Sequence, residues 1–255
     1  MKVSIVIPTY NRPHLLKWNL YSLSKQRISF DFETIVLNDG QQEDGTEGVS
    51  KEYKEKLNIK YFWTGKDNTG WRVPGFSVNR GVKKAVGDII ILCCAEMFHF
   101  DNTIDMLTIP FLNNDKITTS PQTLLDDDGS FLRMLEDSGY NTESENCKIG
   151  DRLRKMKNPH LPFLMGINKN IFLGIGGYDE DFLGVDFDDD DIIRRLKMAG
   201  CSRQIVNAKV IHLYHHRLDI CNNELKKRHD YNKKIFQLRY NVMKRNLNKE
   251  WGVMP

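Results

Sequence analysis

The amino-acid sequence predicts an α/β protein with an open, mainly parallel (mixed) sheet flanked by helices. Two observations indicate this fold. Short apolar segments rich in β-branched residues, at positions 3–7, 32–38 and 89–95, alternate with helical apolar spacing at positions 14–26 and 77–86. Polar residues directly follow each apolar segment, which is typical of repeated β-α-β units.

Local chemistry sets the bounds of these elements. The first strand ends at Pro8, and the second stops in the turn residues 38–40. Gly87 lies just past the end of the second helix and leads into the third strand. The first helix carries its apolar face at Leu15, Leu16, Leu20 and Leu23.

The third strand ends in a carboxylate. Residues 89–95 form a seven-residue apolar run that suits a strand buried on both faces, and Glu96 follows at once. A carboxylate at the mouth of a buried strand is costly unless a metal ion, a lysine or water meets it. Ligands of open α/β sheets bind outside the carboxyl ends of the strands, so residues 9–11, 38–39 and 94–96 are expected at one rim.

Composition excludes several classes of protein. A chain of 255 residues with 40% hydrophobic and 28% charged residues is globular, and a net charge of +3 does not demand a nucleic-acid partner. No apolar stretch approaches the roughly 18 residues of a membrane span, and the N-terminal apolar run is too short for a signal peptide. The five cysteines are odd in number and lack CxxC spacing, which favours a reducing cytoplasm over a disulfide framework or a structural zinc site.

The middle of the chain, residues 113–159, loses the strand–helix alternation and is expected to be an irregular insertion at the active rim. Its charge run at residues 126–128 is interpreted as a solvated loop. A long insertion at this rim can carry acceptor specificity.

Four consecutive aspartates, residues 188–191, open a predicted helix that ends at Gly200. The helix dipole favours one or two acidic residues at this end, but four adjacent like charges repel one another. The repulsion raises at least one pKa, which is what a general base requires.

Three histidines, His212, His215 and His216, lie at the end of another β-branched segment. Imidazole and carboxylate together suit Mn²⁺ or a similar divalent ion bound with a phosphate. The same pattern is therefore interpreted as a metal site rather than as packed or exposed bystanders.

These segments resemble, in the same order, the motifs of family 2 nucleotide-sugar glycosyltransferases of the GT-A fold. The resemblance rests on "SIVIPTYNRP", "IVLNDG", "NRGVKKAVGDIIILCCAE", "GGYDEDFLG" and "DDDDIIRRLKMAG" and covers roughly residues 1–217. It implies a Rossmann-like nucleotide-binding half and a nucleotide-sugar donor, which is expected to be a UDP-sugar. The histidine-containing segment also resembles galactosyltransferase-like relatives, in which an acidic cluster precedes a metal-binding histidine.

The resemblance implies roles for particular residues. Asp189 matches the catalytic base, and Asp188 stands where the family usually has a glutamate. His215 matches the metal-ligand histidine, with His212 as a rival. The expected nucleotide-binding residues are Pro8, Thr9, Tyr10, Asn11, Asp39, Arg72, Asn79, Cys94 and Ala95.

The family's Asp-X-Asp motif falls at Cys94-Ala95-Glu96. In relatives the first aspartate reaches the ribose or sugar and the last coordinates the metal, Mn²⁺ or Mg²⁺, that bridges the diphosphate. Glutamate keeps the ligand, whereas cysteine loses the first carboxylate. Asn38 likewise replaces an aspartate beside Asp39, so base recognition is expected to differ.

The resemblance implies an inverting transfer in which Asp189 deprotonates an acceptor hydroxyl. The acceptor stays open between a glycan, a lipid-linked sugar, a protein and a modified nucleic acid. Two rivals remain: a nucleotidyltransferase, which lacks support because no glycine-rich phosphate loop follows the first strand, and a non-catalytic nucleotide- or sugar-binding protein.

The chain is expected to divide into a catalytic domain at residues 1–225 and a basic helical extension at residues 226–255. Ile235, Leu238 and Val242 recur at helical spacing with Tyr231 one turn earlier, so this face is expected to dock on the catalytic domain. The opposite face is either a solvated cover or a landing surface for a polyanionic acceptor or for a membrane carrying a lipid-linked one.

Overall fold

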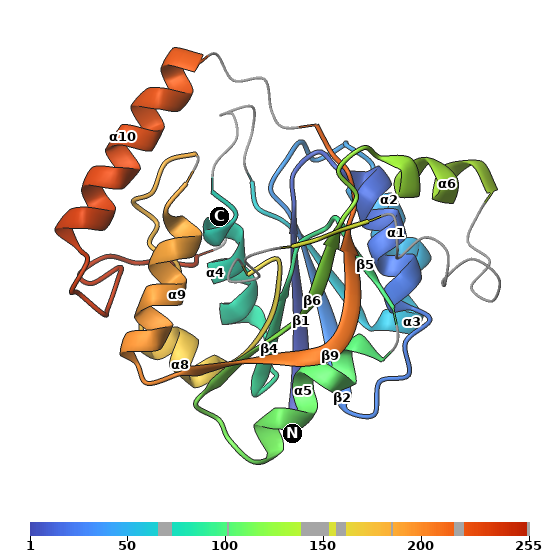
Figure 1. Cartoon of the computed structure of the whole chain (residues 1–255), viewed down its shortest axis with the longest axis horizontal. Helices are drawn as coiled ribbons and strands as arrows, with labels where there is room; N and C mark the ends of the chain where they lie inside the picture. The colour runs from blue at the N-terminus through green and yellow to red at the C-terminus, as the bar shows by residue number, and fades with distance from the viewer. Residues whose placement is uncertain are drawn as a thin grey trace.

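The structure is a computed structural model that describes residues 1–65, 73–100, 102–138, 153–156, 162–184, 186–216 and 222–253. A curved mixed sheet runs through the molecule and has helices on both faces (Figure 1). The predicted α/β class with a mixed sheet flanked by helices is therefore confirmed.

The secondary structure follows the predicted alternation through the first 100 residues. The strands are β1 (Lys2–Thr9), β2 (Asp31–Asn38), β3 (Ile59–Trp63), β4 (Ile89–Cys93), β5 (Met97–His99), β6 (Ile117–Leu125), β7 (Arg154–Lys155), β8 (Leu164–Asn168) and β9 (Ser202–His212). The helices are α1 (Pro13–Leu23), α2 (Thr46–Glu52), α3 (Lys54–Leu57), α4 (Gly75–Lys84), α5 (Thr103–Thr108), the 3₁₀ helix η1 (Ile109–Leu112), α6 (Ser130–Ser138), α8 (Lys169–Gly174), α9 (Asp188–Met198) and α10 (Asn222–Leu238).

The strand order places the predicted rim at one edge of the sheet. Within the described residues the order is β3-β2-β1-β4-β8-β6-β9-β5, with β7 paired to β6. Strands β3, β2, β1 and β4 are parallel, and β8 runs antiparallel between β4 and β6. The carboxyl ends of β1, β2 and β4 therefore meet, as the sequence predicts.

Alternating side chains of the strands bury two layers of core. On one face Ile5, Ile7 and Ile91 pack with Leu16 and Leu20 of α1. On the other face, Val6, Ile90 and Leu92 of the strands pack with residues of α4, α8 and α9. The helix that opens with the four aspartates is thus anchored on the sheet through Ile192 and Leu196.

The expectation of an irregular insertion at residues 113–159 is wrong for its described parts. Residues 117–125 form β6, which pairs with both β8 and β9, and residues 130–138 form α6. The strand was missed because its sequence, ITTSPQTLL, is polar rather than aliphatic. A buried hydroxyl of this strand finds a partner on a neighbouring helix: the Thr119 hydroxyl donates to the Leu107 carbonyl of α5 at 2.8 Å.

Of the residues expected to dock the C-terminal extension on the catalytic domain, only Ile235 is buried, so the rest of that prediction is wrong. The side chain of Ile235 is 9% exposed, whereas Leu238 is 73% and Val242 46% exposed. Helix α10 ends at Leu238, so Val242 lies outside the helical periodicity. None of the helices in the described ranges has the length and apolarity needed to cross a membrane.

Candidate active site

A cavity of about 680 Å³ opens at the carboxyl ends of the central strands. Its walls bring together residues from four distant parts of the chain: Arg12, Glu96, Asp189 and the pair His212 and His215. The predicted base and the predicted metal ligands therefore face one space.

Glu96, His212 and His215 form a group with the composition of a metal site. Strand β5, which follows Glu96, pairs with β9, so Met97 lies opposite His212. Nε2 of His212 lies 3.6 Å and Nε2 of His215 3.5 Å from the same Glu96 Oε1 atom. One ligand atom from each residue lies within 4.8 Å of the others, so both histidines, and not one of the two rivals, converge on Glu96.

The protonation states suit a cation ligand set. Burial lowers the pKa of His212 and of His215, although the carboxylate of Glu96 opposes this. Burial raises the pKa of Glu96, but Arg12, His212 and His215 outweigh burial and hold it below its usual value. Near neutral pH the group thus offers two neutral imidazoles and one carboxylate, which bind a divalent ion well.

Arg12 is a site residue that the sequence reasoning missed. Its Nη1 atom donates to Glu96 Oε1 at 3.0 Å, and the side chain lines the cavity. It follows the predicted nucleotide loop in "PTYNRP", but a single arginine after a strand carries no recognisable signal. The Arg12 guanidinium is therefore a positive group that meets the Glu96 carboxylate at the end of the buried strand.

The four aspartates of α9 differ in their surroundings. Asp189 lines the cavity, and the hydroxyl of Tyr178 donates to its Oδ1 atom at 3.4 Å. Burial raises the pKa of Asp189 to about 6; the Tyr178 hydrogen bond opposes this shift and Asp190 adds to it. Burial, followed by repulsion from Asp189, raises the pKa of Asp188 well above its ordinary value. Asp191 instead forms an ion pair with Arg195 at 2.7 Å.

A second, smaller cavity of about 60 Å³ adjoins the first. The two share Pro8, Arg12, Pro74, Cys94 and Glu96 in their walls. Thr9, Tyr10, Asp39 and Ser77 complete the smaller cavity, so five of the predicted nucleotide residues gather there: Pro8, Thr9, Tyr10, Asp39 and Cys94.

Two hydroxyls in the wall of the smaller cavity are buried without a hydrogen-bond partner. They belong to Thr9, which the sequence predicts, and to Ser77, which it does not. The Asp39 carboxylate accepts a hydrogen bond from the Thr64 hydroxyl at 2.5 Å. Unsatisfied buried hydroxyls beside a carboxylate are the arrangement expected where a polar ligand binds.

The remaining predicted nucleotide residues have other surroundings. Asn79 is fully buried, and its side chain donates to the Tyr178 carbonyl and to Glu180, both at 2.9 Å. Asn79 therefore ties α4 to residues 178–180 and lines neither cavity. This differs from its expected contact with the nucleotide. Ala95 is buried away from both cavities, and Arg72 lies outside the described residues.

Asn11 shapes the loop that lies over the smaller cavity. It adopts the left-handed region, with φ of 51°, and its Oδ1 atom accepts from the Gln41 amide at 3.0 Å. A Cβ on Gly40 would lie 2.2 Å from that same oxygen. Only glycine fits at position 40, so these two residues join the ends of β1 and β2.

Within the charge run at residues 126–128, which was expected to be a solvated loop, Asp126 is an exception. Asp126 is 2% exposed, and its carboxylate accepts from the amides of Phe131 and Leu132 at the start of α6. It is therefore a buried helix cap rather than part of a solvated loop. Asp127 forms an ion pair with Arg154, and both line the large cavity.

The thiol of Cys94, which stands where relatives of this type carry a carboxylate, faces both cavities. Burial, followed by repulsion from Glu96, raises its pKa well above the ordinary value. Cys94 therefore brings no charge to the site at neutral pH.

A polar rim with a carboxylate–imidazole group at the carboxyl ends of parallel strands is where open α/β proteins usually bind their ligands. The family model described as "Glycosyl transferase family 2" matches residues 4–172. Since this match covers more than half of the chain, the protein belongs to glycosyl transferase family 2.

The chain is also similar to proteins of known name. It is 25% identical over 233 residues to the chondroitin synthase of Pasteurella multocida, a match that covers 80% of this chain and 24% of that protein. It therefore spans about a quarter of that relative's length.

Solved structures share the fold. GalNAc-T7 with UDP, GalNAc and Mn²⁺ has a TM-score of 0.63 at 18% identity and covers 95% of this chain and 53% of that one. Staphylococcus aureus TarS in complex with UDP has a TM-score of 0.56 at 17% identity, over 83% of this chain and 57% of that one. At these identities the likeness establishes the GT-A fold.

Proposed function

We propose that the protein is an inverting glycosyltransferase that moves a hexose from a UDP-sugar to an acceptor hydroxyl with Mn²⁺ or Mg²⁺ and an aspartate base. The observation that carries this proposal is the shared cavity of Asp189 and the group Glu96, His212 and His215. Membership of family 2 and the UDP-bound structures of the same fold support a nucleotide-sugar donor.

The donor is proposed to span the two cavities. Asp39, Thr9 and Ser77 would hold the nucleoside in the smaller one, which opens into the larger one beside Glu96. The diphosphate would then lie next to Arg12, whose positive charge matches it. Neutral Cys94 stands in place of the aspartate that contacts the ribose or sugar in the family, so the buried Ser77 hydroxyl in the same cavity wall is proposed to make that contact.

Glu96, His212 and His215 would hold the divalent cation. When bound, such a cation supplies Lewis-acid stabilisation of the negative charge on the departing diphosphate. Arg12 pairs with Glu96 at 3.0 Å and keeps its carboxylate ionised and ready for the ion.

Asp189 would accept the proton of the acceptor hydroxyl. The acceptor oxygen forms a bond to the anomeric carbon on the face opposite the diphosphate, and the anomeric carbon–oxygen bond breaks. The electron pair of that bond stays on the β-phosphate oxygen, and the proton rests on an Asp189 carboxylate oxygen. A base with a pKa of about 6 is ionised at neutral pH and still basic enough to share the proton in the transition state.

A glycan is the proposed acceptor. Phe163 and Tyr214 line the large cavity together with the polar pair Asp127 and Arg154. Aromatic faces beside a few polar groups are the usual surroundings of a sugar ring. A lipid-linked sugar, a protein and a modified nucleic acid remain the alternative acceptors, and the contact with a membrane would then be peripheral.

Donor hydrolysis tests the proposal without a known acceptor. Purified protein is incubated with a panel of UDP-hexoses in Mn²⁺, in Mg²⁺ and in EDTA, and UDP release is measured. We expect release from one or a few donors with metal and little in EDTA. The control variant His14→Ala, an exposed histidine on α1, should match the wild type, whereas His215→Ala should not.

Calorimetry with UDP separates the alternative function. UDP binding without any donor turnover would favour a non-catalytic binding protein, an outcome that the neutral Cys94 makes worth measuring. The absence of both UDP binding and donor turnover would refute the proposed donor class.

A further inference from the structure

The turn before α9 adopts an unfavourable backbone conformation. Asp186 has φ of 66° and Phe187 has φ of 70°, so two consecutive residues other than glycine lie in the left-handed region. Such residues persist only where the surrounding structure holds them, and they concentrate at functional sites. The Phe187 carbonyl accepts from the Asp191 amide at 2.9 Å, so this turn directly sets the start of the helix that carries Asp188 and Asp189.

Helix α10 contacts this turn through a buried asparagine. Asn232 is fully buried, and its Oδ1 atom accepts from the Leu183 amide at 2.8 Å. Its Nδ2 atom donates to the carbonyls of Leu183 at 3.0 Å and of Asp186 at 3.1 Å. All of these contacts reach backbone atoms, so they fix the path of the chain rather than a side chain.

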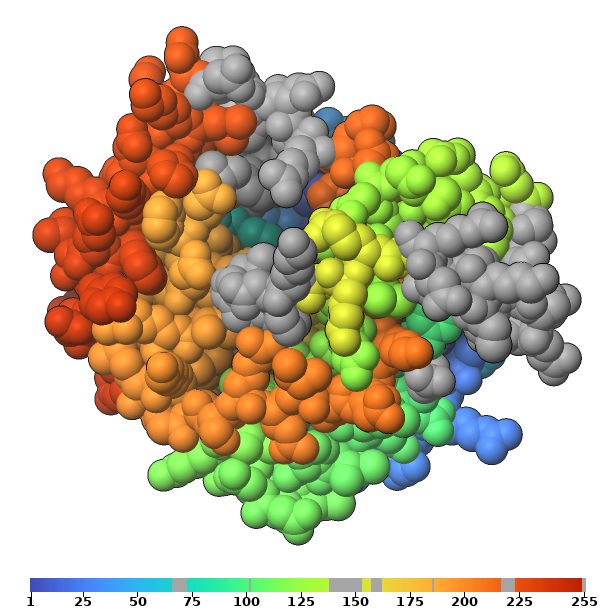
Figure 2. Space-filling model, viewed as in Figure 1, coloured from blue at the N-terminus to red at the C-terminus, as the bar shows by residue number. Residues whose placement is uncertain are grey.

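Side chains of α10 hold the same turn from outside. Nδ1 of His229 lies 2.8 Å from Asp186 Oδ2, and the Phe187 ring packs on His229 and Phe236 with centroids 5.2 and 5.5 Å apart. Figure 1 shows α10 along the flank of the molecule that α9 occupies, and Figure 2 shows the C-terminal residues as a continuous outer layer on that flank.

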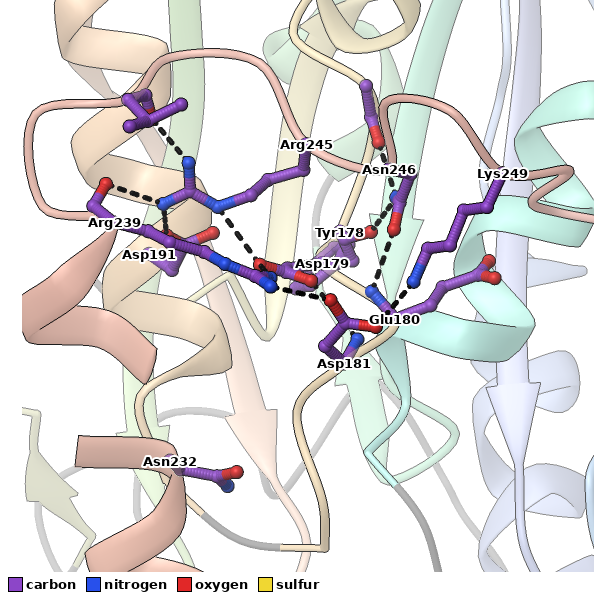
Figure 3. Close-up of polar contacts among 12 residues, drawn as sticks. Tyr178, Asp179, Glu180, Asp181, Asp191, Asn232, Arg239, Arg245, Asn246 and Lys249 are labelled. Atoms are coloured by element: carbon purple, nitrogen blue, oxygen red, sulfur yellow. Dashed lines mark hydrogen bonds and ion pairs between the residues drawn. The ribbon is translucent and has the colours of Figure 1, made fainter. Parts of the chain in front are cut away.

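The chain beyond α10 holds α9 from a second side. Arg245 is 4% exposed and forms ion pairs with Asp191 and, at 3.0 Å, with Asp179. Figure 3 shows Arg239 and Arg245 reaching from the C-terminal segment toward Asp179 and Asp191. Asn246 donates to the carbonyl of Tyr178, whose hydroxyl contacts Asp189.

We propose that Asn232 is a positioning residue for catalysis: it holds the left-handed turn at Asp186 and Phe187 and thereby sets the position from which Asp189 lines the cavity. The inference rests on the proposed function, since it assumes that Asp189 is the base. It also gives the C-terminal segment a role inside the reaction rather than as a cover for the sheet.

The test compares Asn232→Ala with the wild type in Mn²⁺-dependent hydrolysis of the UDP-hexose that the wild type turns over best. We expect kcat to fall at least tenfold while KM and the Kd for UDP stay within about twofold, because the nucleotide site lies at the ends of β1, β2 and β4. Hydrogen exchange of the amides of residues 187–191 should accelerate in the variant even without metal or donor.

Relief of the backbone strain at position 186 gives a more specific test of the proposal. Glycine adopts the left-handed region freely, so Asp186→Gly should restore most of the lost kcat in the Asn232→Ala background. Asp186→Ala removes the same carboxylate and keeps the strain, so it should restore nothing.

Asn168→Ala is the matched control for stability. Asn168 caps α8 by accepting from the amides of Asn170 and Ile171. Its loss should lower the melting temperature without a fall in kcat.

An unchanged kcat in folded Asn232→Ala, or equal behaviour of the glycine and alanine variants at position 186, would overturn the inference. If Asn232→Ala does not fold, Asn232→Asp replaces it, since it keeps the acceptor for Leu183 and loses both donors; the same criteria apply. Failure of the wild type to hydrolyse any donor would instead count against the proposed function.

Discussion

Asp189→Asn is expected to abolish turnover and to make the protein more stable. Burial raises the pKa of Asp189 from 3.8 to about 6, so the folded state disfavours its carboxylate form. A difference of about two pKa units corresponds to about 3 kcal/mol at pH 7.5. Because Asp189 is only partly buried, we expect a gain of about 1–2 kcal/mol, or about 2–8 °C in Tm for a chain of this size.

The sign of this effect depends on pH. Well below pH 3.8 the carboxyl is protonated in both the folded and the unfolded state, so the asparagine variant should gain nothing there. The gain should appear between pH 4 and 6, as the unfolded state ionises first, and should be complete above the folded pKa. Above pH 6, where Asp189 of the wild type is ionised, turnover of the variant should be at least 100-fold lower than that of the wild type, because loss of a general base costs about that much.

Asp191→Asn is the matched control two positions further along the helix. Asp191 is 1% exposed and pairs with Arg195 and Arg245, which are also buried. Removing its charge leaves buried guanidinium groups under-compensated, so we expect a loss of about 3–5 kcal/mol. Thermal unfolding in EDTA between pH 4 and 7.5 measures both variants. A destabilised Asp189→Asn with more than a tenth of wild-type turnover would refute the reasoning.

Three further predictions concern the metal, the pH profile and the basic tail. In calorimetry, Glu96→Ala should weaken UDP binding in Mn²⁺ and abolish the effect of EDTA on that binding. His212→Ala and His215→Ala should each weaken UDP binding to a smaller extent. Equal binding in all variants would exclude the metal site. The kcat/KM for donor hydrolysis should fall about tenfold per pH unit below pH 6, as Asp189 becomes protonated, and a profile flat to pH 5 would exclude that base. Acceptor binding should weaken steeply with salt if the exposed lysines of α10 contact a polyanion or an anionic membrane. A flat salt response would leave only the structural role of the helix. The variant for comparison carries glutamine at Lys226, Lys227, Lys233 and Lys234.

The rim of the site could be predicted because it depends on local rules. Strands that end in Thr9, Asn38 and Cys93 are parallel neighbours, so the residues after them must meet. The metal-site prediction that joined Glu96 with the histidines at the end of β9 came instead from the family resemblance. Their common contact with one carboxylate oxygen could not be derived, because it depends on the pairing of β5 with β9 across more than 100 residues.

Contacts between distant segments explain what the sequence did not reveal. Arg12 and Tyr178 lie inside the motifs "SIVIPTYNRP" and "GGYDEDFLG", but nothing within those motifs singled them out as site residues. Ser77 likewise joins the site only through packing. Strand β6 was missed because several of its buried side chains carry hydroxyls; that of Thr119, for example, is satisfied by a carbonyl of helix α5. The basic face of the tail was expected to be a solvated cover or a landing surface for a polyanion, yet Arg239, Arg245 and Lys249 pair with aspartates of residues 179–191.

The anomeric configuration of the first product tests the central claim, a single displacement with Asp189 as base. The sugar released from a UDP-α-hexose is followed by proton NMR in the first minutes, before mutarotation, with water in place of the acceptor. We expect the β anomer in the wild type and no release above background from Asp189→Asn. Initial release of the α anomer by the wild type would contradict the single displacement and the role of Asp189.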